Sequence, residues 1–269
     1  MFSYEVDREK YVYHYTSRET AIEHILETFK IMASSFLSLN DPKESKNWWF
    51  VAENTDGFTP ENGQSLYDAM LHSQYLIKGN CKIFCCSRDL PTTEYYPRYF
   101  GRGFAKPRMW ATYGRNHSGV CFAFDKKKLT ELFHRHSQAT NQRLFHGDVN
   151  YNDSEFPYEA LRFSAKEICK DYSVVPELLN QKIESLIDEH FPYYFLHKYT
   201  DWSSESETRW IIRGSNSNPE FIDISEAICG IILGSEFNQV YRPLIKAKAE
   251  SKNIEVRQLH WRNGVAGAL

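Results

Sequence analysis

The stretch "WSSESETRW", residues 202–210, places two glutamates, Glu205 and Glu207, two positions apart. The apolar residues that follow favour an extended strand, in which successive side chains point to opposite faces. On such a strand Glu205, Glu207 and Arg209 would share one face, and Trp210 would lie on the other. We therefore predict a strand whose tryptophan face is buried and whose carboxylates face a cleft. The alternative is a solvated edge strand on which Arg209 pairs with one of the glutamates.

The composition of the chain is that of a folded globular protein. Its 269 residues are 42% hydrophobic and 25% charged, and its net charge of −3 is typical neither of a generally basic nucleic-acid binder nor of an acidic tail. We expect a single domain over residues 1–269. The longest apolar run, "GIILG", is too short to cross a bilayer, so no membrane association is expected.

The six cysteines contain no C-x-x-C pair, and four of them lie in apolar runs such as "KIFCCS" and "GVCFAF". This distribution is typical of buried free thiols in a reducing cytoplasm rather than of a disulfide framework. No cluster of carboxylates has metal-ligand spacing either. The sequence therefore predicts a cytoplasmic protein without a metal site.

The periodicity of apolar residues predicts an α+β fold. Residues 158–190 have a helical period that is broken near Pro176, which predicts a helical insertion at about 155–195. No internal repeat or linker indicates a domain boundary. The expected strands are 11–17, 81–87, 120–125, 145–151, 202–214, 228–234 and 254–261, and the other expected helices are 21–29, 66–77 and 237–252.

The motif "HYTS", residues 14–17, lies at the end of the first expected strand. On that strand His14 and Thr16 would point to one face, with Tyr15 on the other. A histidine at such a place can bind a ligand, or it can be a core residue that is hydrogen-bonded to a neighbour. The motif alone does not decide between these two roles.

The segment 95–110, "YYPRYFGRGFAKPRMW", interleaves basic and aromatic side chains. Arg98, Arg102 and Arg108 could neutralise phosphates while the aromatic rings stack on bases, in a dinucleotide or in a nucleic acid. The alternative is a surface loop with aromatic anchors. The sequence contains no G-x-G-x-x-G, P-loop or G-x-S-x-G motif, so a Rossmann cofactor site, a Walker NTP site and a hydrolase elbow are disfavoured.

Five blocks together resemble a family of uncharacterised bacterial proteins. This resemblance covers nearly the whole chain, but it implies little about activity. The blocks are "YHYTS" (13–17), "LNDPKE" (39–44), "MWATYGRNHSG" (109–119), "WSSESETR" (202–209) and "ICGIILG" (228–234).

The order of the motifs also resembles that of the ADP-ribosyltransferase superfamily, which has a histidine on an early strand, a serine on a central strand and an E-x-E segment on a late strand. The matching residues here are His14 with Thr16, then Ser87, then Glu205 and Glu207. The segment "CCSRD" around Ser87 departs from the usual S-T-S pattern. The resemblance implies split, mostly antiparallel sheets around a central cleft.

The same resemblance implies roles for individual residues. Glu207 would stabilise an oxocarbenium-like ribose when the nicotinamide bond of NAD breaks, and Glu205 would orient or deprotonate the acceptor. His14 would bind the adenosine-side ribose. The remaining NAD contacts would come from Thr16 and Ser87, from Tyr15 or Tyr113 against the nicotinamide, and from Arg98, Arg102 and Arg108 on the pyrophosphate.

The predicted function is therefore NAD-dependent ADP-ribosyl transfer to a nucleic acid or a protein. Such activity is harmful to the host cell when unregulated, which suggests a toxin or a phage-defence effector with an antitoxin partner. One alternative is an RNA-acting, nuclease-like protein that uses His14, His117 and the basic aromatic loop. Another is a non-catalytic nucleotide-binding or interaction module.

Overall fold

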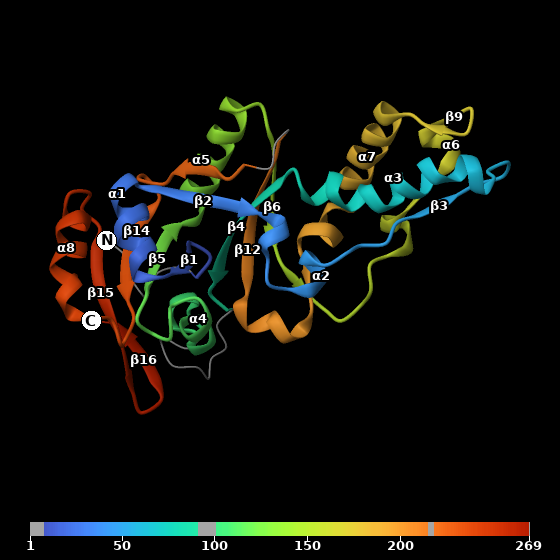
Figure 1. Ribbon diagram of the computed structural model, residues 1–269. Coiled ribbons are helices and arrows are strands. Elements are labelled where there is room, and N and C mark those ends of the chain that lie inside the picture. The colour runs from blue at the N-terminus through green and yellow to red at the C-terminus, as the bar shows by residue number, and fades with distance from the viewer. Residues whose placement is uncertain (1–7, 91–100, 215–217, 269) are drawn as a thin grey trace.

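The computed structural model describes residues 8–90, 101–214 and 218–268. Ten strands in this part of the chain form one sheet, in which all neighbours except β14 and β15 are antiparallel (Figure 1). The predicted α+β fold with a mostly antiparallel sheet is confirmed. The strands are β1 (Tyr11–Thr16), β2 (Lys30–Ser35), β4 (Cys81–Arg88), β5 (Val120–Asp125), β6 (Arg143–Asp148), β12 (Glu207–Arg213), β13 (Glu220–Asp223), β14 (Ile228–Leu233), β15 (Glu255–Arg262) and β16 (Val265–Ala268).

Three further pairs of short strands lie outside this sheet. They join β3 (Val51–Glu53) to β8 (Arg162–Ser164), β7 (Asn150–Tyr151) to β11 (His197–Lys198), and β9 (Cys169–Lys170) to β10 (Ser173–Val174). The helices are α1 (Leu26–Thr28), α2 (Pro42–Ser45), α3 (Pro60–Lys78), α4 (Pro107–Thr112), α5 (Lys126–Ala139), α6 (Ala165–Ile168), α7 (Pro176–Phe195) and α8 (Arg242–Glu250).

The helical segments differ in detail from the prediction. Residues 20–25 form a turn of π-helix, and only 26–28 after it are α-helical. Pro176 does not break a helix but opens α7 at its first position, where the missing backbone N–H of proline costs nothing. The helix α5 was not predicted. No helix in the described parts of the chain combines the length and the apolarity needed to cross a membrane.

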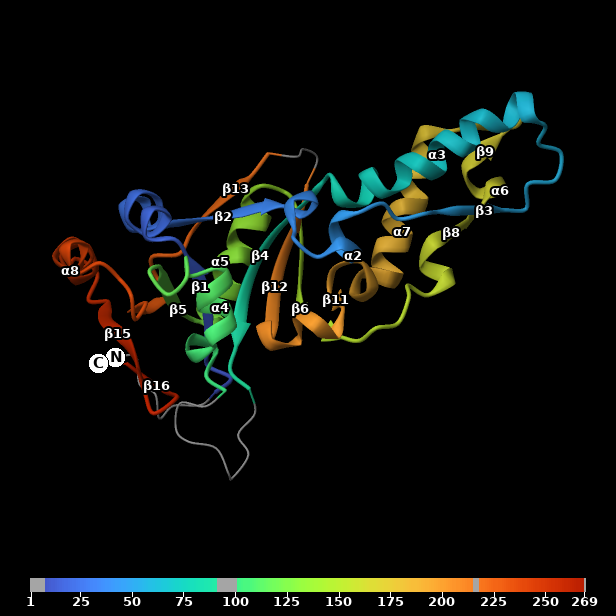
Figure 2. The same cartoon turned by 60° about the horizontal axis from the view of Figure 1, so that its bottom comes forward.

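Helices cover both faces of the central strands (Figures 1 and 2). On one face Trp210 of β12 stacks on Phe133 of α5, with ring centroids 5.6 Å apart. On the other face Ile211 belongs to a core that includes residues of α3 and α7, which lie side by side beyond the end of the sheet. Tyr15 and Trp110 belong to a third core, beneath α4.

The strand β4 has different partners along its two edges. One edge pairs with β12 from Cys81 to Ser87. The other edge pairs with β2 only at Lys82 and Ile83, and with β1 only at Ser87 and Arg88. Between these two contacts β1 and β2 diverge, so residues 84–86 have no strand partner on that edge within the described chain. This divergence opens the sheet where the candidate site lies.

The close approach of Gly119 to β1 gives a stability prediction. A Cβ at Gly119 would overlap the carbonyl oxygen of Thr16, so Gly119→Ala must displace backbone and is expected to cost about 1–3 kcal/mol of unfolding free energy. Gly63 in α3 has open space around its Cα, so Gly63→Ala should stabilise by about 0.5–1 kcal/mol. Urea unfolding measures both changes. Equal stability of wild type and Gly119→Ala would contradict the packing of β5 against β1.

Candidate functional site

A cavity of about 260 Å³ lies where β1 and β2 separate. Its wall includes His14 from β1, Tyr113 at the end of α4, Lys198 from β11, and Glu207 and Arg209 from β12. The fold therefore brings His14 and Glu207 to one cavity, although the chain separates them widely. The order of the motifs had led us to expect this.

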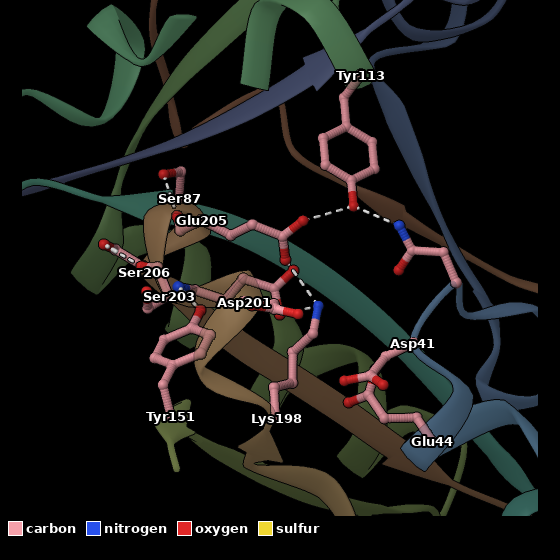
Figure 3. Close-up of polar contacts among 12 residues, drawn as sticks. Asp41, Glu44, Ser87, Tyr113, Tyr151, Lys198, Asp201, Ser203, Glu205 and Ser206 are labelled. Atoms are coloured by element: carbon pink, nitrogen blue, oxygen red, sulfur yellow. Dashed lines mark hydrogen bonds and ion pairs between the residues drawn. The ribbon is translucent and has the colours of Figure 1, made fainter. Parts of the chain in front are cut away.

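The glutamate pair is built by a turn and not by a strand. Residues 200–205 form a 3₁₀ helix, Ser206 is left-handed with φ 47°, and β12 begins only at Glu207. The prediction that Glu205 lies on the strand is therefore wrong. The turn nevertheless brings both carboxylates to Lys198. The Nζ of Lys198 lies 2.7 Å from Oε2 of Glu205 (Figure 3) and 3.7 Å from Oε2 of Glu207.

Glu207 is held through one oxygen only. Its Oε2 lies 2.8 Å from Nε and 2.6 Å from Nη2 of Arg209, in addition to the contact with Lys198. Burial by itself would raise the pKa of Glu207, but Arg209 and Lys198 outweigh burial and lower it. The carboxylate is therefore ionised at neutral pH. Among the described residues, Oε1 of Glu207 has no hydrogen-bond partner.

Arg209 connects β12 to α2 and to the end of α7. Its side chain is 0% exposed, and its Nη1 binds both Oε1 of Glu44 and, at 2.8 Å, the carbonyl oxygen of Phe195. Burial raises the pKa of Glu44, and Arg209 opposes this shift. Because β12 has β4 on one side and β6 on the other, and its ion pairs are buried, the alternative of a solvated edge strand is wrong.

Glu205 is enclosed by its partners. Its Oε1 accepts a 2.7 Å hydrogen bond from the Tyr113 hydroxyl and its Oε2 accepts one from Lys198, while the side chain is 1% exposed (Figure 3). The Ser87 hydroxyl and Lys106 Nζ both donate to its carbonyl oxygen. Glu205 is not part of the cavity wall, so the predicted direct contact with an acceptor is not supported.

Two tyrosines complete the surroundings of the glutamates. Tyr113 donates to Glu205 and accepts a 2.7 Å bond from the side-chain amide of Asn40, and burial together with Glu205 raises its pKa. The hydroxyl oxygen of Tyr151 accepts the backbone N–H of Glu207 at 2.8 Å, and burial raises its pKa as well. Both hydroxyls are therefore protonated at neutral pH.

His14 has a defined protonation state in this cavity. Its Nδ1 lies 3.0 Å from the carbonyl oxygen of Cys85, which can only accept, so Nδ1 carries a proton. Burial lowers the pKa of the ring, although the bond to Cys85 opposes this, and the ring is neutral at pH 7. Its Nε2 is consequently an acceptor, with no partner among the described residues.

The other residues that we predicted to contact NAD, Thr16, Tyr15 and Ser87, either lie away from the cavity or use their hydroxyls on protein partners. Thr16 is buried and does not line the cavity. Tyr15 lines it, but its hydroxyl donates to the carbonyl oxygen of Gly103 and its ring packs on Trp110. Ser87 also lines the cavity, and its hydroxyl is used by the Glu205 carbonyl. These residues support the wall of the cavity.

The predicted phosphate contacts of the basic segment are not supported by the structure. Arg102 is 1% exposed, with Nε 3.1 Å from Asp89 and Nη2 bonded to the Tyr13 hydroxyl, so it balances a buried charge. Arg108 is at the surface, where it donates to the carbonyl oxygen of Asp201 and does not line the cavity. Arg98 lies outside the described residues.

His117 does not share the cavity with His14. It lies in the left-handed turn before β5, with its ring 6.2 Å from that of Trp261. The nuclease-like alternative therefore loses the pairing of histidines on which it was based.

Sequence reasoning missed three residues of the site. Lys198 belongs to no motif. The sequence indicated such a residue only indirectly, because two carboxylates close together need a cation beside them. Asn40 and Glu44 both lie in the "LNDPKE" block that we recognised, but we assigned them no role. Their partners Tyr113 and Arg209 lie far away in the chain, so these contacts depend on the fold.

The comparisons with known proteins can now be set beside this geometry. Residues 109–210 match the model of a family described as "Protein of unknown function (DUF2971)". The matched segment contains Tyr113, Lys198, Glu205 and Glu207, and the expectation of an uncharacterised family is met over it. It leaves out the blocks at 13–17, 39–44 and 228–234. Neither the curated proteins nor the solved structures give a significant match.

The buried ion pairs of Arg209 predict that its removal greatly lowers the free energy of unfolding. Arg209→Met would leave Glu44 and Glu207 buried without their shared cation, which should cost about 3–5 kcal/mol of unfolding free energy. Arg135→Met is the matched control, because Arg135 and Glu226 are both more than half exposed and should contribute at most about 1 kcal/mol. Urea unfolding of both variants would show the difference. Similar losses in the two would contradict the central role of Arg209.

Lys106 predicts a pH dependence of stability. Burial lowers its pKa to about 7, whereas an unfolded lysine titrates near ~10.4. Between these values the unfolded state holds a proton that the folded state has lost, so the contribution of Lys106 to stability increases from pH 7 to 9. In Lys106→Met this increase should be smaller than in wild type. Lys246→Met, at an exposed position of α8, should match wild type, and a Lys106→Met profile parallel to wild type would overturn the assignment.

Proposed function

We propose that the protein is an NAD-dependent ADP-ribosyltransferase whose reaction takes place at Glu207. One observation carries this proposal: Glu207 and His14 line one cavity at the opening between β1 and β2, and one carboxylate oxygen of Glu207 has no partner in the described parts of the chain. A buried, ionised carboxylate with a free oxygen suits a reaction in which positive charge develops on a ribose.

The charge and size of the site support the same ligand. Three carboxylates (Glu44, Glu205 and Glu207) form ion pairs with two cations (Lys198 and Arg209), and Lys106, which donates to the Glu205 carbonyl, loses its charge above its pKa of about 7. Above that pH the group with its carboxylates ionised has one negative charge in excess. Oxidised NAD has a cationic nicotinamide ring. The cavity of about 260 Å³ is near the lower end of ligand pockets, about 300–1,000 Å³, so it would enclose the nicotinamide riboside half and leave the rest of the dinucleotide outside.

The proposed step breaks the bond between ribose C1′ and the nicotinamide nitrogen. The bonding electrons remain on the nitrogen, which becomes neutral, and the ribose acquires oxocarbenium character that Oε1 of Glu207 stabilises. A nucleophile on the acceptor then forms the new bond to C1′ and loses its proton to solvent, while neutral nicotinamide leaves the cavity. Arg209 and Lys198 position the carboxylate through Oε2, so that it does not need to reorganise during the reaction.

The structure disfavours the nuclease alternative and is compatible with the binding-module alternative. A nuclease that relies on His14 and His117 is disfavoured because only His14 lines the cavity. A nucleotide-binding module without catalysis would use the same cavity. It differs from the transferase in one measurable respect, because NAD would bind to it and would not be consumed.

Glu207→Gln tests the proposed reaction. The variant keeps the shape of the side chain and removes its charge, so the rate of nicotinamide release from NAD should fall by a factor on the order of a hundred or more. NAD affinity should change much less, because in bound NAD the positive charge is on the nicotinamide ring and reaches the ribose, which Glu207 would stabilise, only as the bond breaks. Rates with and without a cell lysate as acceptor source, together with calorimetric binding, measure these effects.

Glu226→Gln at the surface is the control and should keep wild-type rates. Circular dichroism must show that Glu207→Gln is folded, because Arg209 loses a charged partner in it. Unchanged nicotinamide release in folded Glu207→Gln would refute the assigned role. Wild-type protein that binds NAD and never releases nicotinamide would favour the binding module.

A further inference from the structure

Three side chains that line the cavity, Tyr113, His14 and Glu207, offer a ligand acceptors and no donor. Tyr113 shows this most clearly. Its proton goes to Oε1 of Glu205, whose other oxygen accepts from Lys198, and one lone pair of its hydroxyl is taken by Asn40. The one remaining position on the Tyr113 oxygen is a lone pair, so this hydroxyl can only accept from a ligand.

Two other groups on the wall have the same polarity. The neutral ring of His14 donates through Nδ1 to the Cys85 carbonyl, which leaves Nε2 as an acceptor. Oε1 of Glu207 is a carboxylate oxygen and can only accept. The cation Lys198 also lines the cavity, but its charge is balanced by Glu205 at 2.7 Å and Glu207 at 3.7 Å.

From this polarity we infer that the cavity selects a neutral or cationic group rich in N–H and O–H donors, and that Tyr113 is a specificity residue that accepts a hydrogen bond from a ligand amide. The inference rests on the proposed function and refines it. In NAD the donors are the ribose hydroxyls and the carboxamide NH₂. A carboxylate in place of the carboxamide would have no proton to donate and would meet a lone pair and a buried carboxylate.

The discriminating experiment compares NAD with its deamidated analogue, nicotinate adenine dinucleotide, by calorimetry on the full chain. Wild type should bind NAD at least about tenfold more tightly than the analogue, because a buried acceptor without a donor is costly. In Tyr113→Phe this preference should shrink several-fold, mainly through weaker NAD binding. Tyr75→Phe, at an exposed position of α3 away from the cavity wall, should retain the preference.

The possible outcomes separate this inference from the proposed function. If neither dinucleotide binds, the proposed function fails and the inference fails with it. If both bind equally well, the site takes the dinucleotide and only the inferred selectivity is overturned. A full preference in folded Tyr113→Phe would assign selectivity to another group and remove Tyr113 from the role. If Tyr113→Phe does not fold, the ratio of the wild-type affinities for NAD and for nicotinate adenine dinucleotide shows by itself whether the cavity prefers a donor.

Discussion

The buried ion pairs of Arg209 are the interaction on which the rest of the site depends. A guanidinium with no exposed surface is tolerated only when carboxylates and carbonyls surround it, and Glu207, Glu44 and the Phe195 carbonyl do so here. These contacts connect β12 to α2 and to the end of α7. Because Asn40 lies two residues before the start of α2, the same connection brings Asn40 within reach of Tyr113. The walls of the cavity are therefore positioned by electrostatic contacts as well as by apolar packing.

The side chains of β12 alternate between an apolar core on one face of the sheet and charged surroundings on the other. Trp210 and Ile212 point into the core that contains α5, where aromatic stacking holds the strand. Glu207 and Arg209 point to the opposite face, where the sheet opens between β1 and β2. A strand anchored rigidly on one face can hold charged groups on the other with little freedom, and such preorganisation is what a catalytic carboxylate needs.

The opening beside β4 also explains the hydrogen-bonding character of the cavity. A strand edge without a neighbour exposes backbone groups that need partners. His14 satisfies one of them, the Cys85 carbonyl, and this single contact determines which ring nitrogen carries the proton. In the same way Glu205 determines the direction in which Tyr113 donates. The Cys85 carbonyl and Glu205 thus decide whether His14 and Tyr113 donate a hydrogen bond to a ligand or accept one from it.

Sequence alone determined the elements whose signal is local. The alternation and apolar content of β1, β4, β5 and β14, and the helical period of α3, are properties of a few neighbouring residues. The four strands form at the predicted places, whereas α3 begins at Pro60 and not at the predicted Leu66. The order of His14, Ser87 and Glu207 was likewise visible in the chain. Tertiary structure decided the rest. The left-handed turn at Ser206 moved Glu205 off the strand, and contacts between distant segments gave Glu44, Lys198 and Asn40 their roles while burying Arg102 against Asp89. The physical reason is that a charged side chain acquires its partner only when the chain closes over a long distance, and no local pattern records which partner that will be.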